Sequence, residues 1–376
     1  MSVLPTKPLP TGALPPMMVG PRLDRLRASL SEAGCDALLL THLTNIRYLT
    51  GFTGSAALLL VSADDAVMVT DGRYGEQAAD QLGSAGAAVR LEVSGDGQRE
   101  ILTAAAAGVG IVGLEAEHVS WAASTRYGET WFPRAELVAT SGVVEALRLV
   151  KDTGEIARIA AAAAIADAAL DRVRPRLADG LSEREFGLEL DTTIRELGAS
   201  GNSFETIVAS GPNGARPHHR PGDRTIGEGD LVVLDFGAKV DGYCSDMTRT
   251  IMVGEPTDTQ SRMLDTVRES QAAGVAAVRA GVAASEVDAA CRAVIDAAGW
   301  GDAFTHGTGH GVGLDIHEAP RVARTSGDTL AAGHIVTVEP GVYLTPHGGV
   351  RVEDTVVVTD TGCEPLTLTP KATSVA

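Results

Sequence analysis

Hydrophobic and polar positions along the first part of the chain follow helical and strand-like spacings in turn. Leu23, Leu26 and Leu30 recur at helical spacing, which predicts a helix over residues 22–34. Short apolar runs bounded by polar residues follow, and they predict buried strands. The predicted strands cover 36–40, 56–61 and 66–70. Helices that alternate with strands are typical of an α/β domain.

The second part of the chain has longer helical patterns. An Ala-rich helix is predicted over 153–177, and Ser182 with Glu185 forms a capping box for a helix that reaches about residue 197. A strand is predicted over 204–208. Two more helices are predicted over 257–281 and 285–299, the second with Ser285 and Asp288 as an imperfect capping box.

One strand pattern occurs twice in this second part. Residues 229–237 and 333–341 both read as an apolar run that ends in a carboxylate, with Gly two residues later. Each segment is followed by a second carboxylate at the head of another β-prone run. The four carboxylates are Asp235, Asp246, Glu339 and Glu353. The repetition predicts two matching hairpins and two related halves of one α/β domain, with the site between the halves.

A carboxylate at the end of an apolar strand tends to leave water, and an unpaired buried charge costs several kcal/mol. Between the repeats, a Gly-rich segment presents His306, His310 and His317. Four carboxylates and an imidazole are a ligand set for two divalent ions about 3.5 to 4 Å apart. The alternative is that the carboxylates are turn residues of ordinary hairpins and the histidines lie on surface loops. The matched recurrence of acid pairs favours the ligand set.

The order of five of these residues resembles the ligand set of the pita-bread metallopeptidases, a family that includes methionine aminopeptidase, Xaa-Pro aminopeptidase and prolidase. The five are Asp235, Asp246, His310, Glu339 and Glu353. The resemblance runs from about Leu147 to residue 376. It implies that Asp235 is a bidentate ligand of one metal, that Asp246 and Glu353 bridge, and that His310 and Glu339 bind the other metal.

The first half of the chain extends the resemblance. The phrases at 45–52 and 71–74 are similar to the N-terminal domain of Xaa-Pro peptidases and creatinase, which methionine aminopeptidases lack. Two interpretations are open for Arg47, Tyr48 and Arg73 in these segments. They have a functional role, or they pack in the domain and form salt bridges. The implied organisation is a Pro-rich disordered leader (1–20), a creatinase-like domain (21–145) and a pita-bread catalytic domain (146–376). The resemblance also implies a homodimer.

Composition narrows the class of protein. The chain has 376 residues, 44 % of them hydrophobic, and a net charge of −18. Such an acidic chain is a poor partner for nucleic acid or anionic membranes, which select clustered Lys and Arg. The four cysteines, Cys35, Cys244, Cys291 and Cys363, are scattered, which favours free thiols. With no signal peptide or membrane span in the sequence, a cytoplasmic enzyme is expected.

The chemistry follows from the implied ligands. Oxygen donors with one imidazole favour Mn²⁺, with Co²⁺, Zn²⁺ or Fe²⁺ as alternatives. The resemblance implies attack by a hydroxide that bridges two metal ions, with Glu339 moving its proton and His317 contacting the substrate carbonyl or oxyanion. His218 matches the family's substrate-side histidine, and His219 beside it is ambiguous. His306 and Arg351 are expected to orient the ligands.

The implied substrates are proline-containing peptides, and two subclasses compete. We expect an Xaa-Pro aminopeptidase, with prolidase as the alternative. Arg321 occupies a position where some prolidases bind the free carboxylate of the dipeptide, which suits a guanidinium group. The complete ligand set argues against a creatinase. It also argues against a non-catalytic binding module on the same fold.

Overall fold

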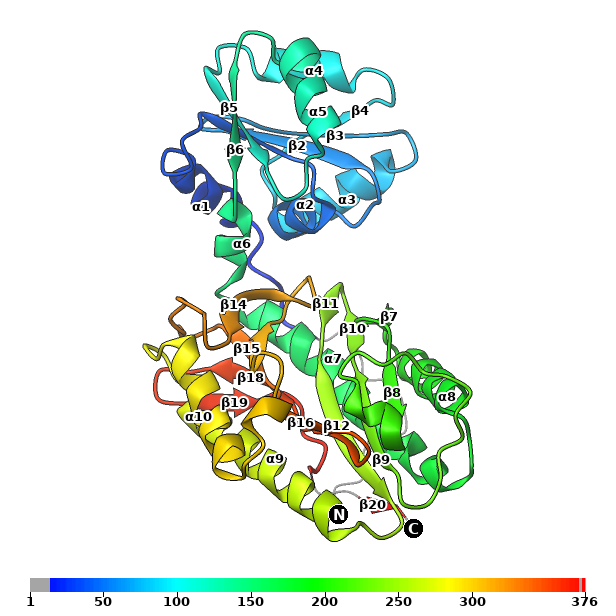
Figure 1. Cartoon of the computed structure of the whole chain (residues 1–376). Coiled ribbons are helices and arrows are strands. Elements are labelled where there is room, and N and C mark those ends of the chain that lie inside the picture. Colours follow the sequence, from blue (N-terminus) through cyan, green and yellow to red (C-terminus); the bar gives the residue numbers. More distant parts are fainter. Residues whose placement is uncertain (1–13, 372–373, 376) are drawn as a thin grey trace. The chain divides into compact units, whose positions relative to one another are not determined.

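The computed structural model describes residues 14–371 and 374–375, and it divides between Arg148 and Leu149 into two units (Figure 1). Residues 17–148 form the smaller unit, and the other described residues form the larger one. The first 13 residues of the predicted leader lie outside the described chain. Within the rest of that leader, Leu14 packs on the core of the larger unit and the Pro15 carbonyl accepts a hydrogen bond from Arg158.

The smaller unit is built on one six-stranded mixed sheet in the order β4-β3-β2-β1-β5-β6. Its strands are β1 (Ala37–Leu40), β2 (Ala57–Ser62), β3 (Ala66–Thr70), β4 (Arg90–Val93), β5 (Ile111–Glu115) and β6 (Glu136–Thr140). Its helices are α1 (Arg22–Ser29), α2 (Leu43–Thr50), α3 (Gly75–Ala85), α4 (Gln98–Ala105), α5 (Trp121–Arg126), the π-helical turn η2 (Tyr127–Trp131) and α6 (Val143–Arg148). The three predicted strands are confirmed to within one residue. Helix α1 ends five residues before its predicted end, where the Leu30 amide bonds to the Arg27 carbonyl in a tighter turn.

Two residues of the creatinase-like segments make structural contacts in this unit. Tyr48 is buried, and its hydroxyl donates to the Leu147 carbonyl at 2.7 Å while the Arg22 guanidinium lies over its ring. Arg73 forms an exposed ion pair with Asp71. The packing and salt-bridge alternatives are therefore confirmed for Tyr48 and Arg73.

The larger unit consists of two related halves. The helices of the first half are α7 (Thr153–Val173), η3 (Arg174–Ala178), α8 (Glu183–Glu196) and η4 (Gly211–Ala215). Its main sheet has the strand order β20 (Ser374–Val375), β12 (Met247–Val253), β9 (Leu231–Phe236) and β8 (Ile207–Ser210). A small sheet follows the order β11 (Tyr243–Cys244), β10 (Ala238–Val240) and β7 (Gly201–Asn202). The helices of the second half are α9 (Asp258–Ala277), α10 (Ala284–Ala297) and η5 (Gly301–Ala303). Its sheet has the strand order β14 (Glu318–Val322), β13 (Gly309–Gly311), β15 (Ile335–Val338), β18 (Asp354–Val358) and β19 (Cys363–Pro365). A separate hairpin is formed by β16 (Gly341–Leu344) and β17 (Gly348–Arg351).

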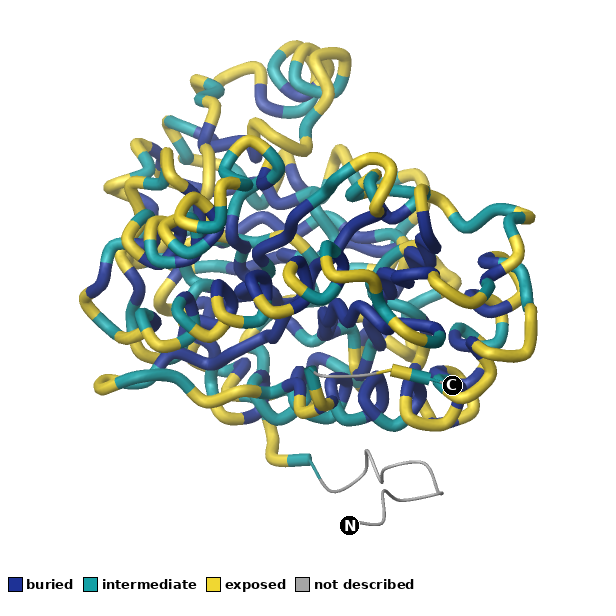
Figure 2. Tube along the Cα trace, turned by 60° about the horizontal axis from the view of Figure 1, so that its bottom comes forward, coloured by how far each residue is buried: buried dark blue, intermediate teal, exposed yellow. Residues whose placement is uncertain are grey.

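Each half buries a helix pair against its own sheet. Helices α7 and α8 share one hydrophobic core with β9 and β12, and α9 and α10 share another with β15 and β18. All seven residues of β12 and all five of β18 are buried. Figure 2 shows the buried residues of the chain in dark blue. Burial of the apolar residues of β9, β12, β15 and β18 in these two cores fixes the strands whose ends carry the four carboxylates.

The helix starts were predicted with mixed success. The Ser182–Glu185 capping box is confirmed. The predicted box at Ser285 and Asp288 is wrong: α10 starts at Ala284 with no side-chain cap. The Asp288 carboxylate instead accepts hydrogen bonds from the Thr308 amide and hydroxyl, because it is buried beside that loop. The strand predicted over 204–208 forms as β8, which begins three residues later and ends two residues later.

Within the described residues, no helix combines the length and the apolar character that a membrane crossing requires. The four cysteines are unpaired, as predicted.

Candidate metal centre

The two repeated hairpins deliver their carboxylates in matching positions. Strands β9 and β12 pair antiparallel, with Asp235 opposite Thr248, and Asp246 immediately precedes β12. Strands β15 and β18 pair antiparallel in the same way, with Glu339 directly after β15 and Glu353 directly before β18. The repeat predicted from the sequence is therefore confirmed as two hairpins, each with one carboxylate at the end of its first strand and one at the start of its second.

The glycines of the His-rich segment allow strand β13 to pass between its neighbours. A Cβ atom on Gly309 would lie 2.0 Å from the Thr337 carbonyl oxygen, and one on Gly311 would lie 2.2 Å from that of Ala319. No side chain fits at either position, so β13 approaches β14 and β15 closely only because both residues are glycine. His310 lies between them.

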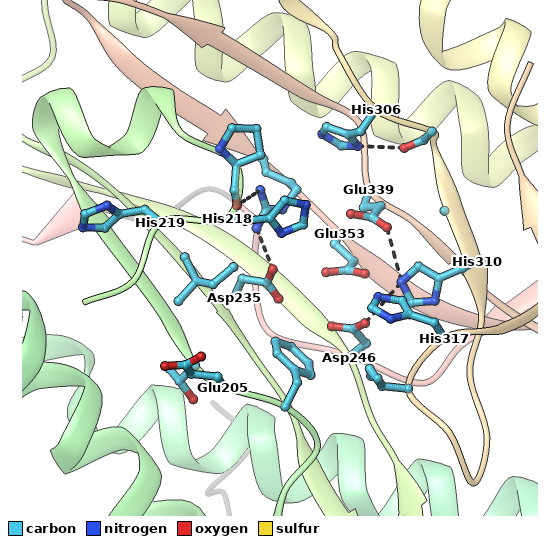
Figure 3. Close-up of a pocket in the computed structure, with 18 of the residues that line it drawn as sticks. Glu205, His218, His219, Asp235, Asp246, His306, His310, His317, Glu339 and Glu353 are labelled. Atoms are coloured by element: carbon cyan, nitrogen blue, oxygen red, sulfur yellow. Dashed lines mark hydrogen bonds and ion pairs between the residues drawn. The ribbon is translucent and has the colours of Figure 1, made fainter. Parts of the chain in front are cut away.

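These elements surround a cavity of about 620 Å³ (Figure 3). All ten residues predicted to form the site lie along its wall. They are His218, Asp235, Asp246, His306, His310, His317, Arg321, Glu339, Arg351 and Glu353. Cys244 is not among the lining residues; it is buried, with its thiol 3.9 Å from the Leu314 carbonyl.

The His310 ring faces the carboxylates with one nitrogen. Its Nε2 atom lies 3.6 Å from an Asp246 oxygen and 3.5 Å from a Glu339 oxygen. The other ring nitrogen, Nδ1, lies 3.0 Å from the Gly311 carbonyl and is therefore the protonated one. Burial lowers the pKa of His310 to about 4, so the ring is neutral at physiological pH. A neutral imidazole with its second nitrogen held by a carbonyl is the form that binds metals.

The carboxylates crowd one another without enough hydrogen-bond donors. Burial and repulsion from neighbouring carboxylates raise the pKa values of Asp246 and Glu353 well above their usual range, and burial raises that of Glu339 to about 8. Buried oxygens of Asp235 (Oδ1) and Glu353 (Oε1) accept no hydrogen bond from any residue that the structure describes. Such groups are rare in native proteins unless an ion or water satisfies them. The donor set therefore fits divalent cations.

A single buried guanidinium holds several of these groups in place. Arg351 donates to Asp235 Oδ2 at 2.6 Å, to the Tyr343 hydroxyl at 2.8 Å and to the Thr248 hydroxyl at 3.1 Å. Thr248 in turn donates to Glu353 at 2.8 Å. The Tyr343 hydroxyl also lies 2.8 Å from His306 Nε2. Arg351 thus links carboxylates from both repeats, directly to Asp235 and through Thr248 to Glu353.

The loop that carries His218 is fixed by its neighbour. His219 Nε2 lies 2.8 Å from Glu183, a fully buried carboxylate that also accepts from the Ser210 amide and hydroxyl and from Asn213. Burial opposes ionisation of Glu183, but these hydrogen bonds outweigh it and lower its pKa. His219, ambiguous from sequence, is therefore an anchor of the loop.

A second group of metal-type side chains lies in the smaller unit and comprises His42, His118 and Glu145. Its two imidazole rings stack 3.6 Å apart with only 10° between their planes. Nitrogen lone pairs lie in the ring planes, so two nearly parallel rings do not direct them at one ion. We assign no metal to this group.

Comparison with known proteins agrees with these two units. The model of the metallopeptidase family M24 matches residues 157–360, and that of the creatinase/prolidase N-terminal domain matches residues 22–150. An uncharacterised peptidase of Bacillus subtilis, YqhT, is 41 % identical over 93 % of this chain and 98 % of its own length.

Two solved structures are also similar along nearly their whole length. An Xaa-Pro dipeptidase from Bacillus anthracis is 41 % identical with a TM-score of 0.91, covering 94 % of this chain and 99 % of that one. An X-Pro aminopeptidase from Thermotoga maritima is 33 % identical with a TM-score of 0.85, covering 93 % and 100 %. The expected fold, a pita-bread domain preceded by a creatinase-like domain, is thereby confirmed.

Proposed function

This chain belongs to metallopeptidase family M24, and on that basis we propose that it is a metal-dependent exopeptidase that hydrolyses the bond before a proline. The chain is a hydrolase, and peptides are the substrates of its family. The observation that carries the proposal is the convergence of four carboxylates, two buried and two half-buried, and the neutral His310 at the wall of one cavity. A cavity of about 620 Å³ is within the usual range of small-ligand sites.

We propose that Asp235, Asp246, His310, Glu339 and Glu353 hold two divalent ions, with Mn²⁺ favoured by the oxygen-rich set. When bound, the ions would supply a nucleophilic hydroxide at neutral pH and polarise the substrate carbonyl. Cations also remove the repulsion among the carboxylates that raises the pKa values of Asp246 and Glu353. Asp235 contributes Oδ1, since its Oδ2 already accepts from Arg351; its expected bidentate role stays a prediction.

The remaining cavity residues bind the peptide and handle the proton. We propose that His317 donates to the scissile carbonyl oxygen; its position in the cavity wall supports this, and its ring meets that of His310 edge to face with centroids 4.4 Å apart. His218 faces the same cavity from the opposite half, on the loop anchored by Glu183 (Figure 3). Glu339, which lies at the cavity wall beside His310, is the carboxylate that we propose takes and returns the proton of the nucleophile.

Two substrate lengths fit this chemistry. We propose an Xaa-Pro aminopeptidase, which releases one residue from a longer peptide. A specific observation also favours an Xaa-Pro dipeptidase: Arg321 lies in the cavity wall, and its side chain can pair with the free carboxylate of a dipeptide. A longer peptide has an amide at that place and offers no such charge.

Replacing Arg321 by Gln distinguishes the two. If the enzyme is a dipeptidase, we expect the KM for an Xaa-Pro dipeptide to rise about 10- to 100-fold, because a hydrogen bond to a charged group contributes about 1.5 to 3 kcal/mol. The kcat should change little. Arg220, which lines the same cavity and is 82 % exposed, supplies the matched control as Arg220→Gln. Steady-state kinetics on the dipeptide and on the same sequence extended by two residues measures both parameters.

An aminopeptidase gives a different pattern in the same assay. It cleaves the extended peptide, releases its first residue, and is unaffected by Arg321→Gln. Failure to cleave either peptide in the presence of Mn²⁺ would contradict the proposed function.

We further propose that the protein is a cytoplasmic homodimer. The four free cysteines support a reducing compartment. The dimer rests on the resemblance to Xaa-Pro peptidases and is tested by light scattering of the full chain.

A further inference from the structure

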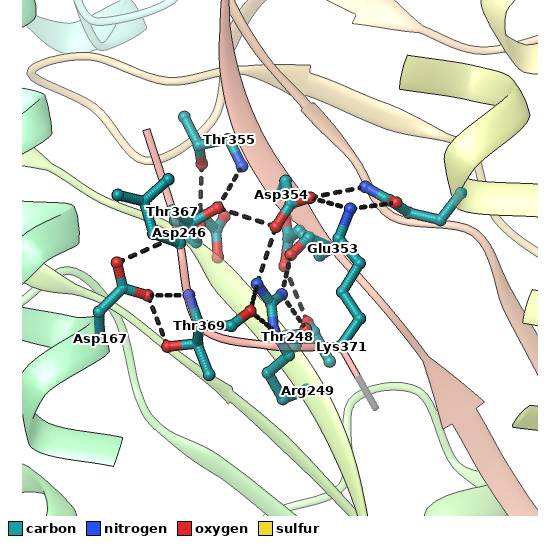
Figure 4. A network of polar contacts seen from close by, with 12 residues as sticks. Asp167, Asp246, Thr248, Arg249, Glu353, Asp354, Thr355, Thr367, Thr369 and Lys371 are labelled. Atoms are coloured by element: carbon teal, nitrogen blue, oxygen red, sulfur yellow. Dashed lines mark hydrogen bonds and ion pairs between the residues drawn. The ribbon is translucent and has the colours of Figure 1, made fainter. Parts of the chain in front are cut away.

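A buried arginine crosses from the first repeat to the second behind the metal centre. Arg249 lies on β12, three residues after Asp246, and its side chain is 1 % exposed. Its Nη1 atom donates to the main-chain carbonyl of Glu353, and its Nη2 atom donates to Asp354 Oδ1 at 2.8 Å (Figure 4). The guanidinium therefore holds the backbone of a proposed metal ligand that belongs to the other repeat.

The second repeat returns the same kind of contact. Thr355 lies on β18, two residues after Glu353, and its hydroxyl donates to the main-chain carbonyl of Asp246 at 2.8 Å. Each repeat thus supplies a buried donor that fixes the backbone of the other repeat's carboxylate. We call Arg249 and Thr355 the clamp.

The clamp is completed by a strap, defined as residues 367–371. The Thr369 carbonyl accepts from Arg249 Nε at 3.0 Å and from Nη2 at 2.7 Å. The Thr367 hydroxyl accepts from the Thr355 amide at 3.2 Å and donates to Asp354 at 3.1 Å. Both clamp residues are therefore bonded to the strap as well as to the metal-centre backbone.

The strap is itself anchored on the helices. On α7, Asp167 accepts from the Leu368 amide at 2.8 Å, the Thr369 amide at 2.9 Å and the Thr369 hydroxyl at 2.6 Å. Lys371 lies 2.6 Å from Asp354 and donates to Gln271 of α9 at 2.8 Å. The anchors tie the strap to one helix of each half.

Arg249 pairs with Asp354 and also binds main-chain carbonyls. A buried ion pair contributes little net stability compared with apolar residues of the same size, so Arg249 and Asp354 need a further reason to be buried together. The planar guanidinium offers donors in a fixed fork, and three of its acceptors are carbonyls rather than carboxylates. Its geometry therefore sets where the backbone at Glu353 lies relative to β12.

We propose that the strap and the clamp are a positioning device that sets the spacing of Asp246 and Glu353 and thereby the affinity for divalent metal. The proposal rests on the proposed function, because it takes these two carboxylates as metal ligands. Groups that orient ligands typically change metal affinity about 10- to 100-fold when altered. Asp167, although it does not line the cavity, belongs to the device.

The first test replaces the strap's anchor. Asp167→Asn keeps the shape but turns one acceptor into an amide donor that faces the Leu368 amide. We expect the Kd for Mn²⁺ of the metal-stripped full chain, measured by calorimetry, to rise about 10-fold or more. Asp171→Asn, an exposed position one turn further along α7, is the matched control and should bind as the wild type does. The melting temperature of the stripped variants is recorded in parallel.

The second test acts on the clamp directly. Thr355→Val removes the hydroxyl at nearly constant volume and should weaken Mn²⁺ binding, whereas Thr355→Ser keeps the donor and should restore it. Lower melting temperatures with unchanged Mn²⁺ affinity in Asp167→Asn and Thr355→Val would overturn the proposal. A wild-type chain that binds no Mn²⁺ would overturn the proposed function as well, so the two failures are distinct.

Discussion

Replacing Asp246 by Asn is expected to abolish hydrolysis while making the metal-free protein more stable. Asp246 is nearly buried, and burial and the charges of Glu353, Asp235 and Glu339 raise its pKa well above the usual range. Asn cannot carry the charge that a bridging ligand supplies. Loss of about 4 kcal/mol of transition-state stabilisation corresponds to about a 10³-fold lower kcat/KM. Without metal, the same change removes a buried repulsion, so the melting temperature should rise.

Both halves of that expectation are measurable on one preparation. Peptide hydrolysis with added Mn²⁺ gives kcat/KM, and thermal unfolding of the stripped protein gives the melting temperature. Asp265→Asn, on the exposed face of α9, is the matched control and should change neither quantity much. An Asp246→Asn enzyme with near-normal turnover would contradict the assignment of this residue as a bridging ligand.

The metal-free protein is expected to lose stability as the pH rises from about 5 to 8. Glu339 has a folded pKa of about 8 against a usual value of 4.5, so the folded state binds more protons than the unfolded state across this window. Stability then falls with rising pH, by about 5 kcal/mol for a single group shifted this far. Asp246 and Glu353 are shifted in the same direction and add to the effect.

Denaturant unfolding of the stripped protein at several pH values measures this dependence. The variant Glu339→Gln should flatten the curve because the titrating group is gone. Saturating Mn²⁺ should reverse the slope, since cations bind the deprotonated carboxylates. If the stability of the metal-free protein rose between pH 5 and 8, this would contradict the claim that burial and mutual repulsion raise the pKa values of these carboxylates.

The convergence of the four carboxylates and His310 was predictable from sequence because the carboxylates recur in a repeated pattern. Asp235 and Glu339 end matched apolar strands, and the flanking glycines mark the segment that brings in His310. The strands were predictable because short, mostly apolar runs such as β9 and β15 are typically buried as strands.

Residues that hold the carboxylates and histidines of the site in place were harder to predict from the sequence. Thr248 lies on β12, two positions after Asp246, which directly precedes the strand; the spacing of two offered a signal for a shared face, and that signal was missed. Glu183 and Arg249 carried no local signal, because their partners lie 36 and 104 positions away along the chain. Contacts of that separation depend on the fold and not on neighbouring residues. Asp288 was misassigned to a helix cap for the same reason.

The most direct test of the metallopeptidase account is a titration of metal-stripped protein with Mn²⁺, followed by hydrolysis of an Xaa-Pro dipeptide and of its two-residue extension. The account predicts no turnover without metal and a rise to a plateau at two ions per chain. Cleavage of at least one peptide, always at the bond before proline, should accompany that plateau. Full turnover in the presence of a strong chelator, or no turnover at any metal concentration, would contradict it.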